Sequence, residues 1–146
     1  MDQLQLKDKL SSIFATQKLA VLATDKDGQP YNCLVAIAGT PDLKPLMFST
    51  LRSTRKYGEL TNNPRVSILI DNRSNTESDF GNAVAVTATG TATEVQGVER
   101  DHLISIYLEK HPNLEDFVNS QDSALIRVDV TEYIISSFNN VWKLRP

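Results

Sequence analysis

The sequence contains few of the residues that usually form disulfides, bind metals or stack on ligands: one cysteine, two histidines and one tryptophan in 146 residues. One cysteine cannot make an intrachain disulfide, so a reducing cytoplasm is the expected location. No apolar run approaches the roughly 18 residues that a membrane-spanning helix needs, and the polar start is unlike a signal peptide. The net charge of −3 argues against a dedicated nucleic-acid-binding protein.

Catalytic and metal-binding motifs are equally scarce. His102 and His111 do not have the spacing that places two imidazoles on one helical face, and no cysteine pair accompanies them, so we expect no metal site. Cys33 has no adjacent base and is expected to be a buried, inert thiol. There is no glycine-rich nucleotide-binding loop, and no pair of carboxylates or Ser/His set stands out. A protein with so few catalytic side chains can leave the chemistry to a bound cofactor.

The pattern of apolar residues predicts a mainly β protein with helical decoration. We expect residues 1–146 to form one domain, because the chain is long enough for one well-buried core and too short for two ordinary domains. Strands are expected at 19–24, 31–38, 46–51, 65–70, 83–95, 124–130 and 133–138, and helices at 6–14, 52–63, 97–110 and 114–118. Since strands and helices do not alternate regularly, an antiparallel barrel is favoured over a doubly wound parallel sheet.

Some segments carry more specific expectations. Gly90 lies inside the longest strand and predicts a bulge or bend. Residues 71–82 are polar and aperiodic, which predicts a long mobile loop that is either a lid or simply disordered. The threonines that alternate with other residues along 87–93 fit a solvated sheet face. Trp142 is expected to pack the C-terminal tail down, although it could stack on a planar ligand.

The most informative pattern is a charge anomaly where a strand gives way to a helix, at Ser53-Thr54-Arg55-Lys56. Ser53 or Thr54 is a suitable N-cap, but two cations follow where the positive end of the helix dipole favours acidic residues. A bound anion would reverse the sign, because free N–H groups, a hydroxyl and two cations would converge on it. The alternative is that these are ordinary surface cations, which solvent and salt screen cheaply. The charge pattern alone leaves both readings open.

The residues around this turn resemble the pyridoxamine 5'-phosphate oxidase-like, FMN-binding split-barrel family. The resemblance is carried by Leu-Ala-Val-Leu-Ala-Thr at 19–24, Phe-Ser-Thr-Leu-Arg-Ser-Thr-Arg-Lys-Tyr at 48–57 and Asn-Asn-Pro-Arg-Val-Ser at 62–67. Ala-Val-Thr-Ala-Thr-Gly-Thr-Ala at 85–92 extends it, with Gly90 at the family's usual glycine. The ordered set of motifs covers most of the chain. It implies a six-stranded antiparallel split β-barrel that works as a homodimer with FMN at the subunit interface.

The resemblance also implies which residues would bind the cofactor. Arg55 and Lys56 would contact the FMN phosphate, helped by the hydroxyls of Thr50 and Thr54, with Ser49 beside them. The strand residues Cys33, Leu34, Val35 and Ala36 would edge the isoalloxazine ring with their backbone. Further candidates, expected to act from the partner chain, are Asn72, Arg73 and Thr87. No catalytic side chain is implied.

The departures from the family pattern narrow the function. Pyridoxamine phosphate oxidases carry an arginine and a lysine where this chain has Cys33 and Ala38, and the basic C-terminal segment that handles pyridoxal phosphate is missing. The sequence therefore predicts an FMN-dependent oxidoreductase acting on another small organic molecule. The alternatives are a non-catalytic flavin-binding or sensing module, a deazaflavin-dependent reductase of the same fold, and a dimeric scaffold without cofactor. No C-terminal histidine loop for heme is present.

Overall fold

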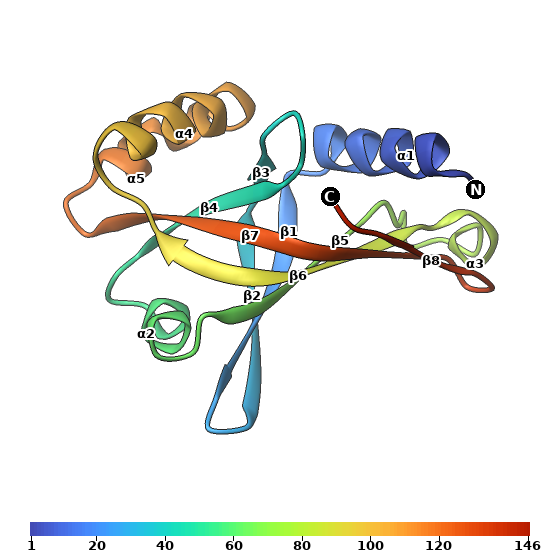
Figure 1. Ribbon diagram of the computed structural model, residues 1–146, viewed down its shortest axis with the longest axis horizontal. Helices are drawn as coiled ribbons and strands as arrows, with labels where there is room; N and C mark the ends of the chain where they lie inside the picture. The colour runs from blue at the N-terminus through green and yellow to red at the C-terminus, as the bar shows by residue number, and fades with distance from the viewer.

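The computed structural model describes residues 1–146, and its strands form one strongly curved antiparallel sheet (Figure 1). The order across the sheet is β2-β1-β5-β6-β7-β4-β3, with β8 paired to β7. The strands are β1 Leu19–Lys26, β2 Gln29–Ala36, β3 Ala38–Gly39, β4 Pro45–Leu51, β5 Arg65–Asp71, β6 Ala85–Glu94, β7 Ser123–Ser136 and β8 Val141–Leu144. Because the sheet curls until β2 lies near β4, it makes the half-open barrel that the sequence predicts.

Six of the eight strands are seven residues or longer and correspond to the six expected barrel strands. The two short ones, β3 and β8, were not predicted. Segments of two and four residues are too short to show a period of two in the sequence. Asp27 and Gly28, with φ of 53° and 85°, form the turn between β1 and β2 that the Asp-Gly pair predicts.

Helices cover both faces and one end of the sheet (Figure 1). They are α1 Gln3–Thr16, α2 Arg55–Asn62, α3 Asp79–Asn82, α4 Gly97–Lys110 and α5 Glu115–Asn119, with a short 3₁₀ turn at Pro112–Leu114. Helix α1 begins with a capping box between Asp2 and Gln5. Its apolar face is buried as predicted, through Leu6, Leu10, Ile13 and Phe14. No helix is long and apolar enough to cross a membrane.

The core lies inside the curve of the sheet and follows the alternation of each strand. In β1, Ala20 and Leu22 point inward, and the residues between them face outward. The same alternation in β5 and β6, together with α1, completes the main apolar cluster. A smaller cluster, centred on Met47 and Tyr107, lies between the sheet and helices α4 and α5. The second cluster fixes α4 against β4, close to the segment that leads into α2.

The bulge expected at Gly90 is confirmed, and β7 differs from its prediction. The pairing of β6 with β7 shifts register between Thr89 and Gly90, so no residue of β6 lies opposite Thr131 in the ladder. A Cβ atom at position 90 would lie 2.3 Å from the carbonyl oxygen of Asp129, which only glycine avoids. The two strands predicted at 124–130 and 133–138 are one continuous strand, because the chain absorbs the break as this bulge.

The loop predicted at 71–82 is confirmed for residues 72–78 but not for its last four residues. Residues 79–82 form the short helix α3. The carboxylate of Asp79 accepts hydrogen bonds from the backbone N–H of Ser74 at 2.9 Å and of Asn75 at 2.7 Å. These bonds, led by that from Ser74, hold the pKa of Asp79 below its usual value. The start of α3 is thus marked in the sequence by a local side-chain-to-backbone motif at Asp79, and hydrophobic periodicity does not detect such a motif.

Candidate functional site

The turn between β4 and α2 is fixed by Ser53 and by Arg52, the residue just before the predicted site. The hydroxyl of Ser53 donates to Asp122 at 2.9 Å, and the guanidinium of Arg52 pairs with Glu94. Tyr57 also donates to Glu94, at 2.6 Å. In the free chain the Ser53 hydroxyl therefore holds the turn to Asp122 and does not cap the helix. Arg52 likewise has a carboxylate partner within the chain.

Helix α2 begins at Arg55, with Thr54 in the N-cap position, but its first N–H groups are left without acceptors. The Thr54 hydroxyl donates to the carbonyl of Leu51 at 2.6 Å and lies 3.1 Å from the hydroxyl of Thr50, so it does not cap the helix. The backbone N–H groups of the next three residues, 55–57, have no partner in the chain. Uncapped N–H groups at the positive end of a helix favour an acceptor with negative charge.

Arg55 is held in one orientation by a carboxylate and an aromatic ring. Its Nε donates to Glu59 at 3.0 Å, and its guanidinium carbon lies 4.0 Å from the centre of the Tyr31 ring on β2. Glu59 is only 4% exposed and also accepts a 2.6 Å hydrogen bond from the hydroxyl of Thr24. That bond, and after it Arg55, keeps the pKa of Glu59 below its usual value. The terminal nitrogens of Arg55 have no partner in the chain.

This arrangement corrects the charge argument made from the sequence. The first turn of α2 contains no acidic residue, yet Glu59, one turn later, offsets the charge of Arg55 as an i,i+4 ion pair. Lys56 forms no ion pair within the chain, and with Arg52 paired to Glu94 it is the one cation of the segment without a carboxylate. The unbalanced positive charge at the start of α2 is therefore that of Lys56, together with the terminal nitrogens of Arg55 that have no partner.

Strand β2 forms one edge of the sheet and meets α2 through the contact of Tyr31 with Arg55. The Ile37 N–H donates to the carbonyl of Lys18 at 3.1 Å, on the β1 side. The alternation of an antiparallel ladder then turns the backbone groups of Asn32 and Leu34 away from β1, toward the open edge. Val35 is buried in the core, and the same alternation turns its backbone groups toward β1, so it offers neither side chain nor backbone to a ligand in the free chain.

Cys33 faces the same side as Tyr31 and is half-buried. Burial raises the pKa of its thiol, and the nearby charge of Lys56 opposes this only in part. The thiol is therefore protonated near neutral pH and unreactive as a nucleophile, as the sequence predicts. The contact of Arg55 with Tyr31, two residues before Cys33 on the same face of β2, places the start of α2 next to this strand.

A buried tyrosine links the two strands that flank this region. The hydroxyl of Tyr107, on α4, donates to the carbonyl of Ala36 at 2.8 Å and accepts from the N–H of Ser49 at 3.4 Å. Burial raises its pKa to about 12, so it stays a neutral donor. The Ser49 hydroxyl is itself buried and lies 2.8 Å from that of Ser123. Ala36 and Ser49 thus have structural roles in the free chain.

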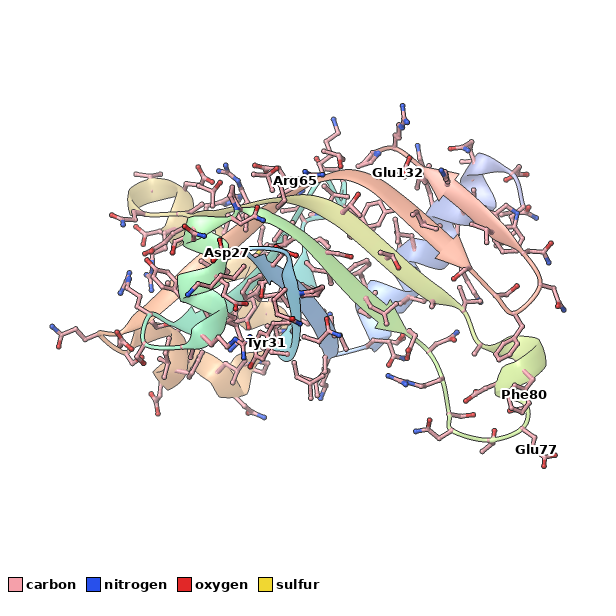
Figure 2. The ribbon with its side chains drawn as sticks, turned by 90° about the horizontal axis from the view of Figure 1, so that it is seen from below. Asp27, Tyr31, Arg65, Glu77, Phe80 and Glu132 are labelled. Carbon is pink, nitrogen blue, oxygen red and sulfur yellow. The ribbon has the colours of Figure 1, made fainter.

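The remaining candidates lie away from α2 within one protomer. Asn72 is tied to Val84 by a 2.8 Å hydrogen bond, and Arg73 pairs with Asp71 at 3.1 Å. They follow the end of β5 opposite to the end that leaves α2. Figure 2 shows Phe80, in the same loop, far from Tyr31. Thr87 lies on the outward face of β6, opposite Leu69. One chain does not bring these three residues to the others.

Several residues of the site could not be named from the sequence. Glu59 could have been named from the sequence, because its i,i+4 spacing from Arg55 is a recognised ion-pair pattern. Tyr31, Thr24 and Tyr107 had no such signal, since their contacts come from strands and a helix that are far away in the sequence.

An exposed apolar row crosses the outward face of the sheet near the same edge. Leu34 is 65% exposed and Leu69 is 37% exposed, and both are paired in register with Val21 between them. Cross-strand neighbours in register form a continuous surface. Beside it lies a mostly polar groove of about 710 Å³ that includes Arg65 and Thr89. The apolar row and this groove leave the outward face of β1, β5 and β6 open in a single chain.

Comparison with solved structures supports the fold. A heme-binding protein from Mycobacterium smegmatis matches with a TM-score of 0.83 at 18% identity, over 95% of this chain and 57% of that protein. An FAD-binding protein from Mesorhizobium loti matches with a TM-score of 0.68 at 21% identity, over 92% of both chains. The heme storage protein HutZ from Vibrio cholerae matches with a TM-score of 0.74 at 19% identity, over 86% of this chain and 89% of that one. At such identities the likeness shows the fold alone, and this chain spans little more than half of the mycobacterial protein.

The sequence comparison is more specific. Curated proteins give no significant match. A family model described as pyridoxamine 5'-phosphate oxidase matches residues 6–136, which include all of the strands from β1 to β7 and the whole of α2. The resemblance inferred from the motifs at 19–24, 48–57 and 62–67 is therefore confirmed. The chain belongs to the pyridoxamine 5'-phosphate oxidase family.

Proposed function

We propose that the chain binds FMN, with its phosphate at the start of α2, and acts as an oxidoreductase on a small organic molecule. The observation that carries the proposal is the set of donors without partners at one point. These donors are the N–H groups of 55–57, the terminal nitrogens of Arg55 and the ammonium of Lys56. A phosphate is a multivalent acceptor that fits such a set.

The residues around the phosphate position would be ready before the ligand arrives. Glu59 and Tyr31 hold the guanidinium of Arg55, so less side-chain entropy is lost when it binds. The open edge of β2 offers the backbone groups of Asn32 and Leu34 to the polar edge of the isoalloxazine ring. When bound, FMN supplies hydride or electron transfer, while this chain positions it and limits its access to water.

We further propose that the working form is a homodimer. The row of Leu34, Val21 and Leu69 is an apolar surface that a second copy can cover. In a dimer Asn72, Arg73 and Thr87 would be supplied by the partner, because in one chain Asn72 and Arg73 follow the end of β5 opposite to α2 and Thr87 lies on β6 beyond it. The cofactor would then lie between the subunits.

Vitamin B6 oxidation is not part of the proposal. Cys33 is half-buried with a protonated thiol, and Ala38 is buried in the cluster beneath α4. Neither residue can contact the phosphate of a pyridoxal compound as an arginine or lysine would. The alternatives are a non-catalytic flavin-binding module and a deazaflavin-dependent reductase. Both would place their cofactor at the same α2 and β2 surface.

Two of the structural neighbours are named as heme-binding or heme storage proteins. Heme binding by this chain has less support than FMN binding. The only histidines are His102, exposed on α4, and His111, whose ring is bonded to the carbonyl of Ile37 at 2.7 Å. Both belong to the α4 side of the sheet, whereas α2 lies on the other side (Figure 1). Neither imidazole is available as an iron ligand at the α2 and β2 surface.

The test is a fluorescence titration of FMN and riboflavin with the purified chain. We expect FMN to bind at least tenfold more tightly than riboflavin, because only FMN has the phosphate. If FMN and riboflavin bind with equal affinity, the proposed phosphate site is refuted. If the protein quenches the fluorescence of neither flavin, the whole flavin proposal is refuted. Steady oxidation of reduced nicotinamide by the FMN-loaded protein would favour an enzyme; its absence with a broad acceptor panel would favour a flavin-binding module.

A further inference from the structure

A second cleft lies on the other side of the sheet from α2. It is about 600 Å³ in volume and is formed by α1, α4 and the loop between β3 and β4. Figure 1 shows this loop between the two helices, above the sheet. Its apolar lining includes Phe14 of α1, Leu43 of the loop and Ile106 of α4. The proposed flavin site uses none of these residues.

Lys110, the last residue of α4, lines this cleft with a buried amine. Its Nζ has less than 1 Å² of exposed surface and no hydrogen-bond partner. Burial lowers the pKa of this amine to about 8. At neutral pH most molecules still carry the charge there, and a buried charge without a partner is unfavourable. The site therefore lacks a negative partner.

No group of the chain supplies that partner. The titratable residues that share the cleft are His102 and Glu109, both exposed and both on α4. Helix α1 contributes none, and the loop contributes none that lines the cleft. Asp42, the nearest acid of the loop, accepts instead from the Thr40 hydroxyl and the Lys44 N–H. His111 is occupied by the carbonyl of Ile37.

We propose that this cleft binds a small organic carboxylate: the Lys110 side chain turns into the cleft to meet the carboxylate group, and an apolar body packs against Phe14, Leu43 and Ile106. A carboxylate needs few donors, and one ammonium with the nearby Ser11 hydroxyl can supply them. Inorganic phosphate would need more donors and would leave the apolar lining uncovered. Apolar clefts with one or two polar groups are typical of sites for small organic ligands.

The test compares phenylacetate with phenylacetamide, which has the same shape and no charge. Binding is followed by amide chemical shifts and by thermal melting of the purified full chain. We expect phenylacetate to shift resonances of α1 and α4 and to bind at least tenfold more tightly than the amide. Equal affinities for the acid and the amide, or no binding of phenylacetate, benzoate or hexanoate at millimolar concentration, would overturn the proposal.

Two variants locate the binding. Lys110→Met keeps the length of the side chain and removes the amine, so we expect phenylacetate affinity to fall about tenfold, to the level of the amide. Lys44→Met changes an exposed lysine on the neighbouring loop and should leave the affinity unchanged. Unchanged phenylacetate affinity in the Lys110 variant would overturn the proposal. If that variant fails to fold, the comparison of acid and amide on the unmodified chain decides the question alone.

Discussion

The cations at the start of α2 and the lysine at the end of α4 have opposite surroundings. Arg55 is half-exposed, and a buried carboxylate and an aromatic ring fix its direction. Lys110 is shielded from water and has no polar partner at all. At α2 the chain supplies a counter-charge and still leaves donors unused, whereas at α4 it supplies none. The first surface is suited to a strongly charged group, and the second to a weakly charged, mostly apolar one.

The largest effect is expected at α2. Replacing Arg55 and Lys56 together with alanine removes two charge-assisted contacts, each worth roughly 1.5–3 kcal/mol. FMN affinity should fall by about 100-fold or more, while riboflavin affinity should change less than threefold. Fluorescence titration of both flavins measures this. Equal losses for FMN and riboflavin would place the phosphate elsewhere.

The second effect concerns Lys110 and is seen in stability. Its pKa in the folded chain is about 8, below that of an unfolded lysine near 10.5, so the unfolded state binds more protons between these values. Lys110→Met should raise the free energy of unfolding at pH 7 by about 1–2 kcal/mol after allowance for solvent screening. The advantage should disappear as the pH rises from 8 toward 10. Urea denaturation at both pH values, with Lys44→Met as the control, measures it.

The raised pKa values of Tyr107 and Tyr133 do not disturb this comparison. Both tyrosines are buried and neutral in the folded state, so they destabilise the fold above about pH 10 in the variant and the unmodified chain alike. A stability difference that is the same at pH 7 and pH 10 would contradict an unpaired ammonium at Lys110.

A smaller effect is expected when Glu59 loses its charge. The pKa of Glu59 is lowered in the folded chain, so its contribution to stability is present above the unfolded value and is lost as the pH falls through the folded value. Glu59→Gln should therefore unfold at lower urea than the unmodified chain at pH 7, and the two should converge as the pH falls below the ordinary pKa range of a carboxyl group. Thermal melting across this range tests the sign. A constant gap would show that the lost bond to Thr24 or Arg55, and not the charge, matters.

The sequence predicted the elements around the candidate site better than the contacts within it. Helix α4 ends where His111-Pro112 predicts, and α2 follows β4 at the expected turn, because caps and prolines act locally. The partners of Arg55 are harder to foresee, since Tyr31 comes from the β1–β2 hairpin. Strand β8, which holds Trp142 against the core as expected for the tail, is too short to leave a pattern.

The smallest effect tests whether Arg55 is held in place by Tyr31. The ring supplies a cation–π contact worth about 0.5–1 kcal/mol at a surface site. Tyr31→Leu should therefore weaken FMN binding only about two- to fivefold, with riboflavin unchanged, because Glu59 still orients the guanidinium. Tyr31→Phe keeps the ring and should bind FMN as the unmodified chain does. If the leucine variant binds FMN normally, the Glu59 pair alone suffices to orient Arg55. If the phenylalanine variant is as weak as the leucine one, the tyrosine hydroxyl contacts the flavin directly.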